Sequence, residues 1–198
     1  MNLKSVGVIG AGQMGSGIAQ VFAMAGFQVV LNDVRQKQLD QAMGLIESNI
    51  ERQVAKGKTT PGEKSAALDL IKPALDLEFV GQCDLVIEAA TERETVKQAI
   101  FEALAPHLAP HTILTSNTSS ISITRLAART DRPEKFMGFH FMNPVPAMQL
   151  VELIRGIATD DATYQTLLAV VERLGKTSAT AEDYPAFIVN RILLPMIN

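Results

Sequence analysis

One histidine and one glutamate are spaced so that they could act together as a base and its partner. His140 and Glu152 are 12 residues apart, and their midpoint, Pro146, belongs to a stretch that must turn, Asn143–Pro146. A fold-back at that turn pairs the two residues on adjacent strands. A carboxylate beside an imidazole fixes the tautomer of the ring and stabilises its charged form, as a general base requires. The alternative is a core histidine bonded to a nearby acid, with no catalytic role.

A glycine-rich turn near the N-terminus has the spacing of a dinucleotide-binding loop. Gly10, Gly12 and Gly15 follow the apolar run 6–9 in the pattern G-x-G-x-x-G, and a helical segment comes next. The first glycine permits a tight turn, the second lets a pyrophosphate approach the backbone, and the third lets the helix pack close to the strand. Unpaired N–H groups at the helix start then face the phosphates. The alternative is a glycine-rich turn that binds nothing.

An acid at the end of the second predicted strand indicates which dinucleotide binds. Asp33 lies 23 residues after Gly10, where a carboxylate can bond the ribose hydroxyls of an adenosine. The same carboxylate repels a 2′-phosphate, so the pattern favours NAD over NADP. Arg35, two residues later, could instead partner such a phosphate, and this leaves NADP open.

These residues depend for their positions on strands and helices that alternate along the chain. Strands are expected over 6–9, 29–31, 85–87, 112–115, 136–141, 148–154 and 176–181. Helices are expected from about 14 to Gly26 and over 36–56, 61–70, 93–104, 123–128 and 161–174. The alternation predicts an α/β fold with a doubly wound, Rossmann-type sheet that is mostly parallel and has an antiparallel, hairpin-like edge.

Two predicted helices separate the second strand from the strand at 85–87. We interpret them as a helical arm, about residues 36–72, that is inserted after the second strand. Thr60-Pro61-Gly62-Glu63 matches the start of the second helix. Insertions of this kind often carry substrate contacts. The basic residues of the arm could meet a phosphate-bearing ligand or form a solvated face; they are Arg52, Lys56, Lys58 and Lys64.

Polar residues follow two further predicted strands at the sheet edge where ligands bind in such folds. Thr91 and Glu92 lie just past the strand at 85–87, and Ser116–Ser120 follow the strand at 112–115. These segments are a source of polar contacts to a ligand. The alternative is a plain turn rich in hydroxyl groups.

The composition is that of an ordinary soluble globular protein, with 47% apolar and 20% charged residues. The net charge of -3 is not gathered into blocks, so nucleic acid and anionic membranes are poor candidates for the main partner. No apolar run is long enough to span a membrane. The single cysteine, Cys83, fits a reducing compartment, which we expect to be the cytoplasm. No metal is expected.

Five segments together resemble the L-3-hydroxyacyl-CoA dehydrogenases, and most closely the 3-hydroxybutyryl-CoA dehydrogenase branch. They are GAGQMGSGIA, LVIEAATE, SNTSS, GFHFMNPVPAMQLVELI and PAFIVNRIL. The match runs from residue 3 to the chain end, and the fourth segment is far more specific than the glycine loop. The resemblance implies reversible, NAD-dependent oxidation of a short-chain L-3-hydroxyacyl-CoA to the 3-ketoacyl-CoA, as in the β-oxidation branch of fatty acid metabolism.

The resemblance also implies roles for individual residues. It makes His140 the base, oriented by Glu152, and Ser119 a contact to the substrate and cofactor region. Asn143 and Asn190 help to hold the reacting carbonyl or the nicotinamide end. Cofactor contacts map to Gly10, Ala11, Gly12, Gln13, Met14, Gly15, Asp33, Glu92, Lys97, Asn117, Ser119 and Asn143. Part of the coenzyme A binding falls on the helical arm and maps to Lys56.

The family has a second, helical domain after the segment that matches 189–191, and this domain supplies dimer contacts. We therefore expect an NAD-binding domain over 1–184 and the start of a helical C-terminal domain over 185–198, which the chain end cuts off. The full-length protein is expected to be a homodimer through that domain. Two other functions stay open: a dinucleotide-binding module without catalysis, and a dehydrogenase of free hydroxyacids.

Overall fold

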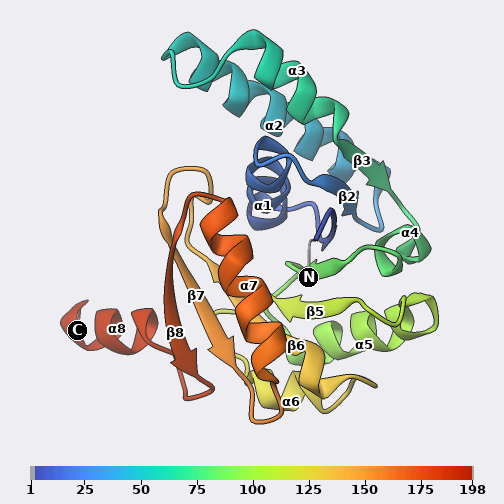
Figure 1. The fold of residues 1–198 in the computed structure, drawn as a ribbon, viewed down its shortest axis with the longest axis vertical. Helices are drawn as coiled ribbons and strands as arrows, with labels where there is room; N and C mark the ends of the chain where they lie inside the picture. The colour runs from blue at the N-terminus through green and yellow to red at the C-terminus, as the bar shows by residue number, and fades with distance from the viewer. Residues whose placement is uncertain (1–2, 198) are drawn as a thin grey trace.

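The protein is organised around one eight-stranded sheet with the strand order β3-β2-β1-β4-β5-β6-β7-β8 (Figure 1). The computed structural model describes residues 3–197, apart from the side chain of Leu194. The strands are β1 (Ser5–Ile9), β2 (Gln28–Asn32), β3 (Ile71–Ala74), β4 (Leu85–Glu88), β5 (Ile113–Ser116), β6 (Phe136–Phe141), β7 (Leu150–Arg155) and β8 (Thr177–Glu182).

Helices cover both faces of the sheet. Apolar side chains of α1, α2 and α7 share one buried cluster with the sheet, and those of α4, α5 and α6 share another. The helices are α1 (Gln13–Met24), α2 (Gln36–Ala55), α3 (Pro61–Asp69), α4 (Leu77–Gly81), α5 (Glu94–Leu104), α6 (Ile123–Ala127), α7 (Asp161–Arg173) and α8 (Val189–Ile197). Within residues 3–197, no helix has both the length and the apolar character needed to cross a membrane.

The alternation of side chains along the strands explains why two clusters form. In β4, Leu85 and Ile87 belong to the cluster of α1, whereas Val86, between them, belongs to the cluster of α5. A strand that is apolar on both faces is typical of a parallel sheet covered by helices on both sides. The fold therefore has three layers, with the sheet in the middle.

The strands from β3 to β6 are parallel, and the chain reverses its direction of travel across the sheet between β1 and β4. β1 pairs with β2 on one side and with β4 on the other, so the loops that follow β1 and β4 part at this point. A crevice at such a switch point is the usual ligand site of an open α/β sheet. The predicted doubly wound sheet is confirmed.

The last part of the sheet is antiparallel, as predicted. β6 and β7 form a hairpin in which His140 pairs directly with Glu152. β8 then returns parallel to β7 and ends the sheet. The predicted fold-back of His140 onto Glu152 is therefore confirmed.

The region around the helical arm differs from the prediction. The two helices form a pair that projects from the sheet (Figure 1), and Thr60 and Glu63 form the predicted capping box of α3. The arm, however, ends earlier than residue 72, because Ile71 already begins β3 beside β2. The strand was missed because it contains Pro73, which a strand tolerates only at a sheet edge. The short helix α4 was missed as well.

Candidate active site

The glycine loop connects β1 to α1 with the geometry that a pyrophosphate needs. Gly10 has a φ of +100°, which side-chain-bearing residues rarely adopt. A β-carbon at Gly15 would lie 1.7 Å from the carbonyl oxygen of Gly10, so only glycine lets the helix start this close to the strand. A β-carbon at Gly12 would instead enter open space, with no heavy atom within 4 Å. The loop is thus packed on one side and open to a ligand on the other.

The open side of the loop faces a cleft of about 610 Å³ at the switch point of the sheet. Gln13 and Met14, the first residues of α1, line it together with Gly10 and Gly12. The first N–H groups of a helix have no partner within the helix and carry the positive end of its dipole. The cleft residues therefore fit the pyrophosphate of a dinucleotide.

Asp33 lies in the same cleft at the end of β2. Its Oδ2 accepts a hydrogen bond of 3.1 Å from the N–H of Ala11, and its Oδ1 lies 3.7 Å from Nε of Arg35. Gln38, in the first turns of α2, donates to the carbonyl oxygen of Ala11 at 2.9 Å. The backbone N–H and the carbonyl oxygen of Ala11 are therefore both held by hydrogen bonds to side chains. Gln38 was not predicted as a site residue, because its partner lies 27 residues away in the chain.

A second cleft, of about 280 Å³, continues the first one toward β6. The two clefts share Met14, Ala89 and Ala90 in their walls, and the second one ends at His140 and Asn143. A ligand bound along both clefts would run from Asp33 to His140 across the carboxyl edge of the sheet. This is the orientation that an extended dinucleotide requires if its reactive end is to meet a base.

His140 and Glu152 form a close pair at the end of this track. Nδ1 of His140 lies 2.7 Å from Oε2 of Glu152, and the glutamate is fully buried. Among residues 3–197, no side chain hydrogen-bonds Nε2 of His140, and the residue keeps 8% of its surface exposed at the cleft. The ring is therefore anchored through one nitrogen and free to exchange a proton through the other.

The environment of Glu152 keeps its carboxyl group ionised. Burial alone raises the pKa of Glu152, but hydrogen bonds from His140 and from the N–H groups of Val189 and Ile188 bring it below the usual value. The two backbone bonds measure 2.8 and 3.0 Å and both reach Oε1. A buried carboxylate stays charged when several donors surround it.

Glu92 organises the loop that carries Ser119. Its Oε1 accepts hydrogen bonds from the hydroxyl of Thr118 at 2.6 Å, the N–H of Ser119 at 2.8 Å and the hydroxyl of Ser119 at 3.1 Å. Burial raises the pKa of Glu92, and these bonds, with the charge of Lys97, lower it below its usual value. Both Glu92 and Ser119 line the cleft that ends at His140.

Lys97, predicted as a cofactor contact, lies behind Glu92 and is 1% exposed. Its ammonium bonds both oxygens of Glu88 at 2.9 and 2.8 Å and lies 3.5 Å from Glu92. Glu88, which the sequence analysis did not name as a site residue, also accepts a bond of 2.6 Å from Ser116. The side chain of Lys97 therefore forms a buried ion pair with Glu88 beneath the site. The position of Glu88 at the end of a predicted buried strand is the sequence feature that could have identified it as a site residue.

The three asparagines of the predicted site come from different segments of the chain. Asn117 lines the cleft and its Oδ1 accepts a bond of 2.8 Å from the N–H of Phe141, next to His140. Asn143 lines the cleft just after β6. Asn190, on α8, donates to the carbonyl oxygen of Ser119 at 3.1 Å. All three therefore adjoin the base or the serine loop.

Lys56 lies outside these clefts, in a cavity of about 320 Å³ between the helical arm and the turn after β6. Arg52, Lys58 and Pro144 also line this cavity. Pro144 directly follows Asn143, so the basic cavity adjoins the cleft that ends at His140 and Asn143. The arrangement gives three cationic groups beside one end of the cleft.

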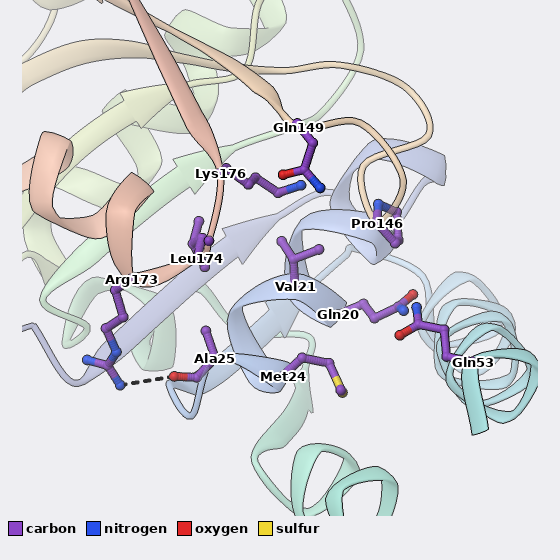
Figure 2. Close-up of a pocket in the computed structure, with 11 residues that line it drawn as sticks. Gln20, Val21, Met24, Ala25, Gln53, Pro146, Gln149, Arg173, Leu174 and Lys176 are labelled. Atoms are coloured by element: carbon purple, nitrogen blue, oxygen red, sulfur yellow. Dashed lines mark hydrogen bonds between the residues drawn. The ribbon is translucent and has the colours of Figure 1, made fainter. Parts of the chain in front are cut away.

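Another cavity of about 320 Å³ lies against the C-terminal half of α1, where Gln20, Val21 and Met24 line it (Figure 2). Its two cationic side chains are already engaged. Arg173 bonds the carbonyl oxygen of Ala25, and Lys176 bonds the carbonyl oxygens of Val145 and Met148 at 2.8 and 2.6 Å. Burial lowers the pKa of Lys176. These contacts secure the loop before β7 and do not constitute a reaction site.

The fold and the dinucleotide cleft define the class of the protein as an NAD-binding dehydrogenase. The family described as "3-hydroxyacyl-CoA dehydrogenase, NAD binding domain" matches residues 5–184. The chain therefore belongs to the 3-hydroxyacyl-CoA dehydrogenase family, and its cofactor is NAD.

Individual relatives extend this finding. The chain is 61% identical over 196 residues to the 3-hydroxybutyryl-CoA dehydrogenase of Bradyrhizobium diazoefficiens, covering 99% of this chain and 67% of the relative. It is 46% identical to a probable 3-hydroxybutyryl-CoA dehydrogenase of Bacillus subtilis, covering 100% of this chain and 69% of the relative. The crystal structure of (S)-3-hydroxybutyryl-CoA dehydrogenase from Ralstonia eutropha matches with a TM-score of 0.97 and 44% identity, over 100% of this chain and 70% of that one.

Proposed function

We propose that the protein catalyses the reversible, NAD-dependent oxidation of a short-chain L-3-hydroxyacyl-CoA, such as 3-hydroxybutyryl-CoA, to the 3-ketoacyl-CoA. The names of the relatives support the substrate class. The observation that carries the proposal is the 2.7 Å contact of His140 with Glu152 at the end of the dinucleotide cleft. That pair supplies the one proton acceptor that the oxidation of an alcohol needs.

His140 takes the proton of the 3-hydroxyl group on Nε2, because its Nδ1 is committed to Glu152. Glu152 fixes the tautomer that leaves Nε2 unprotonated and then stabilises the imidazolium that forms. The glycine loop and Asp33 would hold NAD, which would supply the acceptor for the hydride from C3 of the substrate. In the reverse direction His140 returns the proton to the carbonyl oxygen.

The polar groups around the pair orient the reactants. Asn143 lines the cleft and can donate a hydrogen bond to the reacting oxygen or to the nicotinamide end. Ser119 also lines the cleft, and its hydroxyl oxygen, whose proton goes to Glu92, can accept a hydrogen bond there. Asn190 supports this loop through the carbonyl oxygen of Ser119, and Asn117 holds the backbone beside His140. Glu92 keeps Ser119 in place, and Lys97 acts on the site through Glu92.

The basic cavity of the helical arm is the proposed contact for the phosphates of coenzyme A. Lys56 lines it together with Arg52 and Lys58, and it adjoins the catalytic cleft at Asn143 and Pro144. Cationic side chains at one end of the cleft suit a substrate whose acyl end meets His140 and whose other end carries phosphate groups. A free hydroxyacid would not use this cavity.

Two further parts of the proposal concern the organisation of the protein. We propose an NAD-binding domain over 1–184 and the start of a helical domain over 185–198, and a homodimer formed through that helical domain. The family match over 5–184 and the exposed apolar side chains of α8 support this division; these are Ile192, Leu193, Met196 and Ile197. A cytoplasmic location stays a prediction based on cysteine usage.

The test compares wild type with His140→Ala in the reduction of acetoacetyl-CoA by NADH. In this direction His140 gives a proton to the carbonyl oxygen, and loss of this general-acid help should lower kcat by roughly 10²–10⁴-fold. NADH affinity, measured by fluorescence titration, should stay within a few-fold, because the glycine loop is unchanged. Turnover close to that of wild type would remove His140 from the role of base. Equal rates of the wild type on free acetoacetate would instead point to a hydroxyacid dehydrogenase, and NADH binding without turnover to a binding module.

A further inference from the structure

The segment that joins β8 to α8 has an unusual backbone. Ala186 and Phe187 are consecutive residues with φ values of +65° and +50°, and neither is a glycine. Such left-handed conformations are unfavourable for residues that carry a β-carbon. Two in succession persist only where the surrounding contacts hold them. This joint, residues 183–189, is therefore held in place by its neighbours.

Both ends of the joint are fixed by ionised carboxylates. Asp183 accepts hydrogen bonds from the hydroxyl of Ser122 at 2.6 Å and from the N–H groups of Ile123 and Thr124 at 3.0 and 2.8 Å. These groups lie at the start of α6. At the other end of the joint, the N–H groups of Ile188 and of Val189, the first residue of α8, bond Glu152. The side chain of Phe187 is buried, and its ring centroid lies 6.3 Å from that of His140.

Glu152 divides its two oxygens between the base and the joint. Oε2 faces Nδ1 of His140 at 2.7 Å. Oε1 accepts from the N–H groups of Ile188 at 3.0 Å and Val189 at 2.8 Å. A carboxylate is planar, so fixing one oxygen from two directions also fixes the direction in which the other oxygen points. The start of α8 thus determines the direction in which Oε2 of Glu152 faces Nδ1 of His140.

We propose that the N–H groups of Ile188 and Val189 are positioning groups for His140, which they orient through Glu152, and that the left-handed turn at 186–187 exists to aim them. The inference rests on the proposed role of His140 as the base. It assigns a function in the reaction to a joint of which no residue lines the cleft that ends at His140. It also makes the orientation of the base depend on where α8 begins.

The same helix reaches the other side of the site. Asn190, one residue beyond Val189, donates to the carbonyl oxygen of Ser119 at 3.1 Å. A displacement of the start of α8 would therefore disturb the base through Glu152 and the serine loop through Asn190. The proposal concerns the first of these connections, because there the bonded group is a buried charge and each donor bond to a charge is strong.

Val189→Pro tests the proposal by removing one donor. Val189 is the first residue of α8, a position that accepts proline because its N–H has no partner within the helix. We expect kcat to fall roughly tenfold to hundredfold, the size of one hydrogen bond to a charged group. KM for NADH should change less than about threefold, since the glycine loop is distant in the fold. Val189→Ala keeps the N–H group and is the reference for the loss of the side chain.

The imidazole proton on Nδ1 of His140 gives a readout that does not need turnover. Its NMR resonance should shift in Val189→Pro and stay near the wild-type position in Val189→Ala. A double-mutant cycle with Glu152→Gln adds a second check, because the amide is neutral and its bond to the N–H group is about half as strong. The effect of Val189→Pro on kcat should then fall to roughly threefold to tenfold. An undiminished effect would overturn the proposal.

The wild-type chain allows a comparison that does not depend on how well the proline variant folds. The amide protons of Ile188 and Val189 should resonate downfield in wild type and move upfield in Glu152→Gln, as a charged acceptor is replaced by a neutral one. Unchanged amide resonances would overturn the inference even if the enzyme is active. Lack of acetoacetyl-CoA reduction by wild type, with these resonances behaving as expected, would count against the proposed function only.

Discussion

The glycine loop and the β6–β7 hairpin prepare the site in opposite ways. The loop works through the absence of side chains: a β-carbon at Gly15 would lie 1.7 Å from the carbonyl oxygen of Gly10, and Gly12 leaves open space beside the cleft. The hairpin works through side chains whose polar atoms are bonded, with both oxygens of Glu152 engaged. The glycine loop therefore exposes backbone groups to a ligand, whereas the hairpin holds the charged carboxylate of Glu152 beside His140.

The difference shows what each half can tolerate. A backbone site depends on shape and is insensitive to pH, whereas a site built on buried carboxylates depends on their ionisation. Added volume should therefore damage the first half, and protonation the second. The predictions below test this contrast, beginning with the largest expected effect.

Gly15→Ala should be the most damaging change. The new methyl group would overlap the carbonyl oxygen of Gly10, so that α1 must move away from β1. We expect a loss of more than about 3 kcal/mol in the free energy of unfolding, in the upper range for single substitutions, and no measurable NADH binding. Urea denaturation and fluorescence titration check both. Wild-type stability would show that the close approach is not required.

Gly12→Ala is the matched change at the open side of the loop. No heavy atom lies within 4 Å of the new β-carbon, so stability should stay within about 0.5 kcal/mol of wild type. NADH should nevertheless bind roughly tenfold more weakly, because the methyl group occupies the approach of the pyrophosphate. If Gly12→Ala were as destabilising as Gly15→Ala, the two sides of the loop would not differ as described.

Asp33→Asn introduces a charge effect into the loop half. The carboxylate should accept hydrogen bonds from the ribose hydroxyls, and its loss should weaken NADH binding by roughly tenfold. The side chain of Arg35 is 71% exposed and, with its neighbouring charge removed, can pair with a 2′-phosphate. The ratio of NADPH to NADH affinity should therefore rise by at least about tenfold. Continued rejection of NADPH would assign the discrimination to other groups.

Asp183→Asn tests the acid dependence of the joint beside the hairpin. Burial raises the pKa of Asp183, but bonds from Ser122 and Thr124 bring it below the usual value. A depressed folded-state pKa stabilises the protein above the unfolded pKa of about 3.9, and this stabilisation is lost as the pH falls through the folded value. At pH 7 the variant should be less stable by about 1 kcal/mol, a modest figure because the carboxyl group is half exposed.

The pH profile supplies the control for that prediction. The stability difference between wild type and Asp183→Asn should be constant from pH 7 to about 5 and shrink below about 3.9. Any difference caused by Gly12→Ala should not vary with pH, since no titrating group changes there. A difference for Asp183→Asn that stays constant down to pH 2.5 would show that the carboxylate charge contributes nothing.

The hairpin and the cofactor loop were predictable because their signals are local. The contact of His140 with Glu152 followed from a turn centred on one proline, and the antiparallel register confirms it. The glycine spacing and the capping box of α3 are likewise complete within a few residues. Local patterns of this kind need no knowledge of the rest of the fold.

The missed features depend on distant or atypical contacts. β3 was overlooked because Lys72 and Pro73 interrupt its apolar pattern, and only its position at the sheet edge makes them acceptable. The buried pair of Glu88 and Lys97 joins a strand end to a helix face, and nothing in the sequence marked the lysine as buried. The left-handed turn at 186–187 contains no glycine, so no pattern predicts it.

The antiparallel hairpin has a consequence for how such proteins can diverge. The residues between β6 and β7 alone set the alignment of His140 with Glu152. The crossovers elsewhere, including the helical arm, can lengthen or shorten without altering that alignment. Any change in this connection that shifted the register by one residue would turn the glutamate to the opposite face. Insertions and deletions are therefore least tolerated in the short connection between β6 and β7.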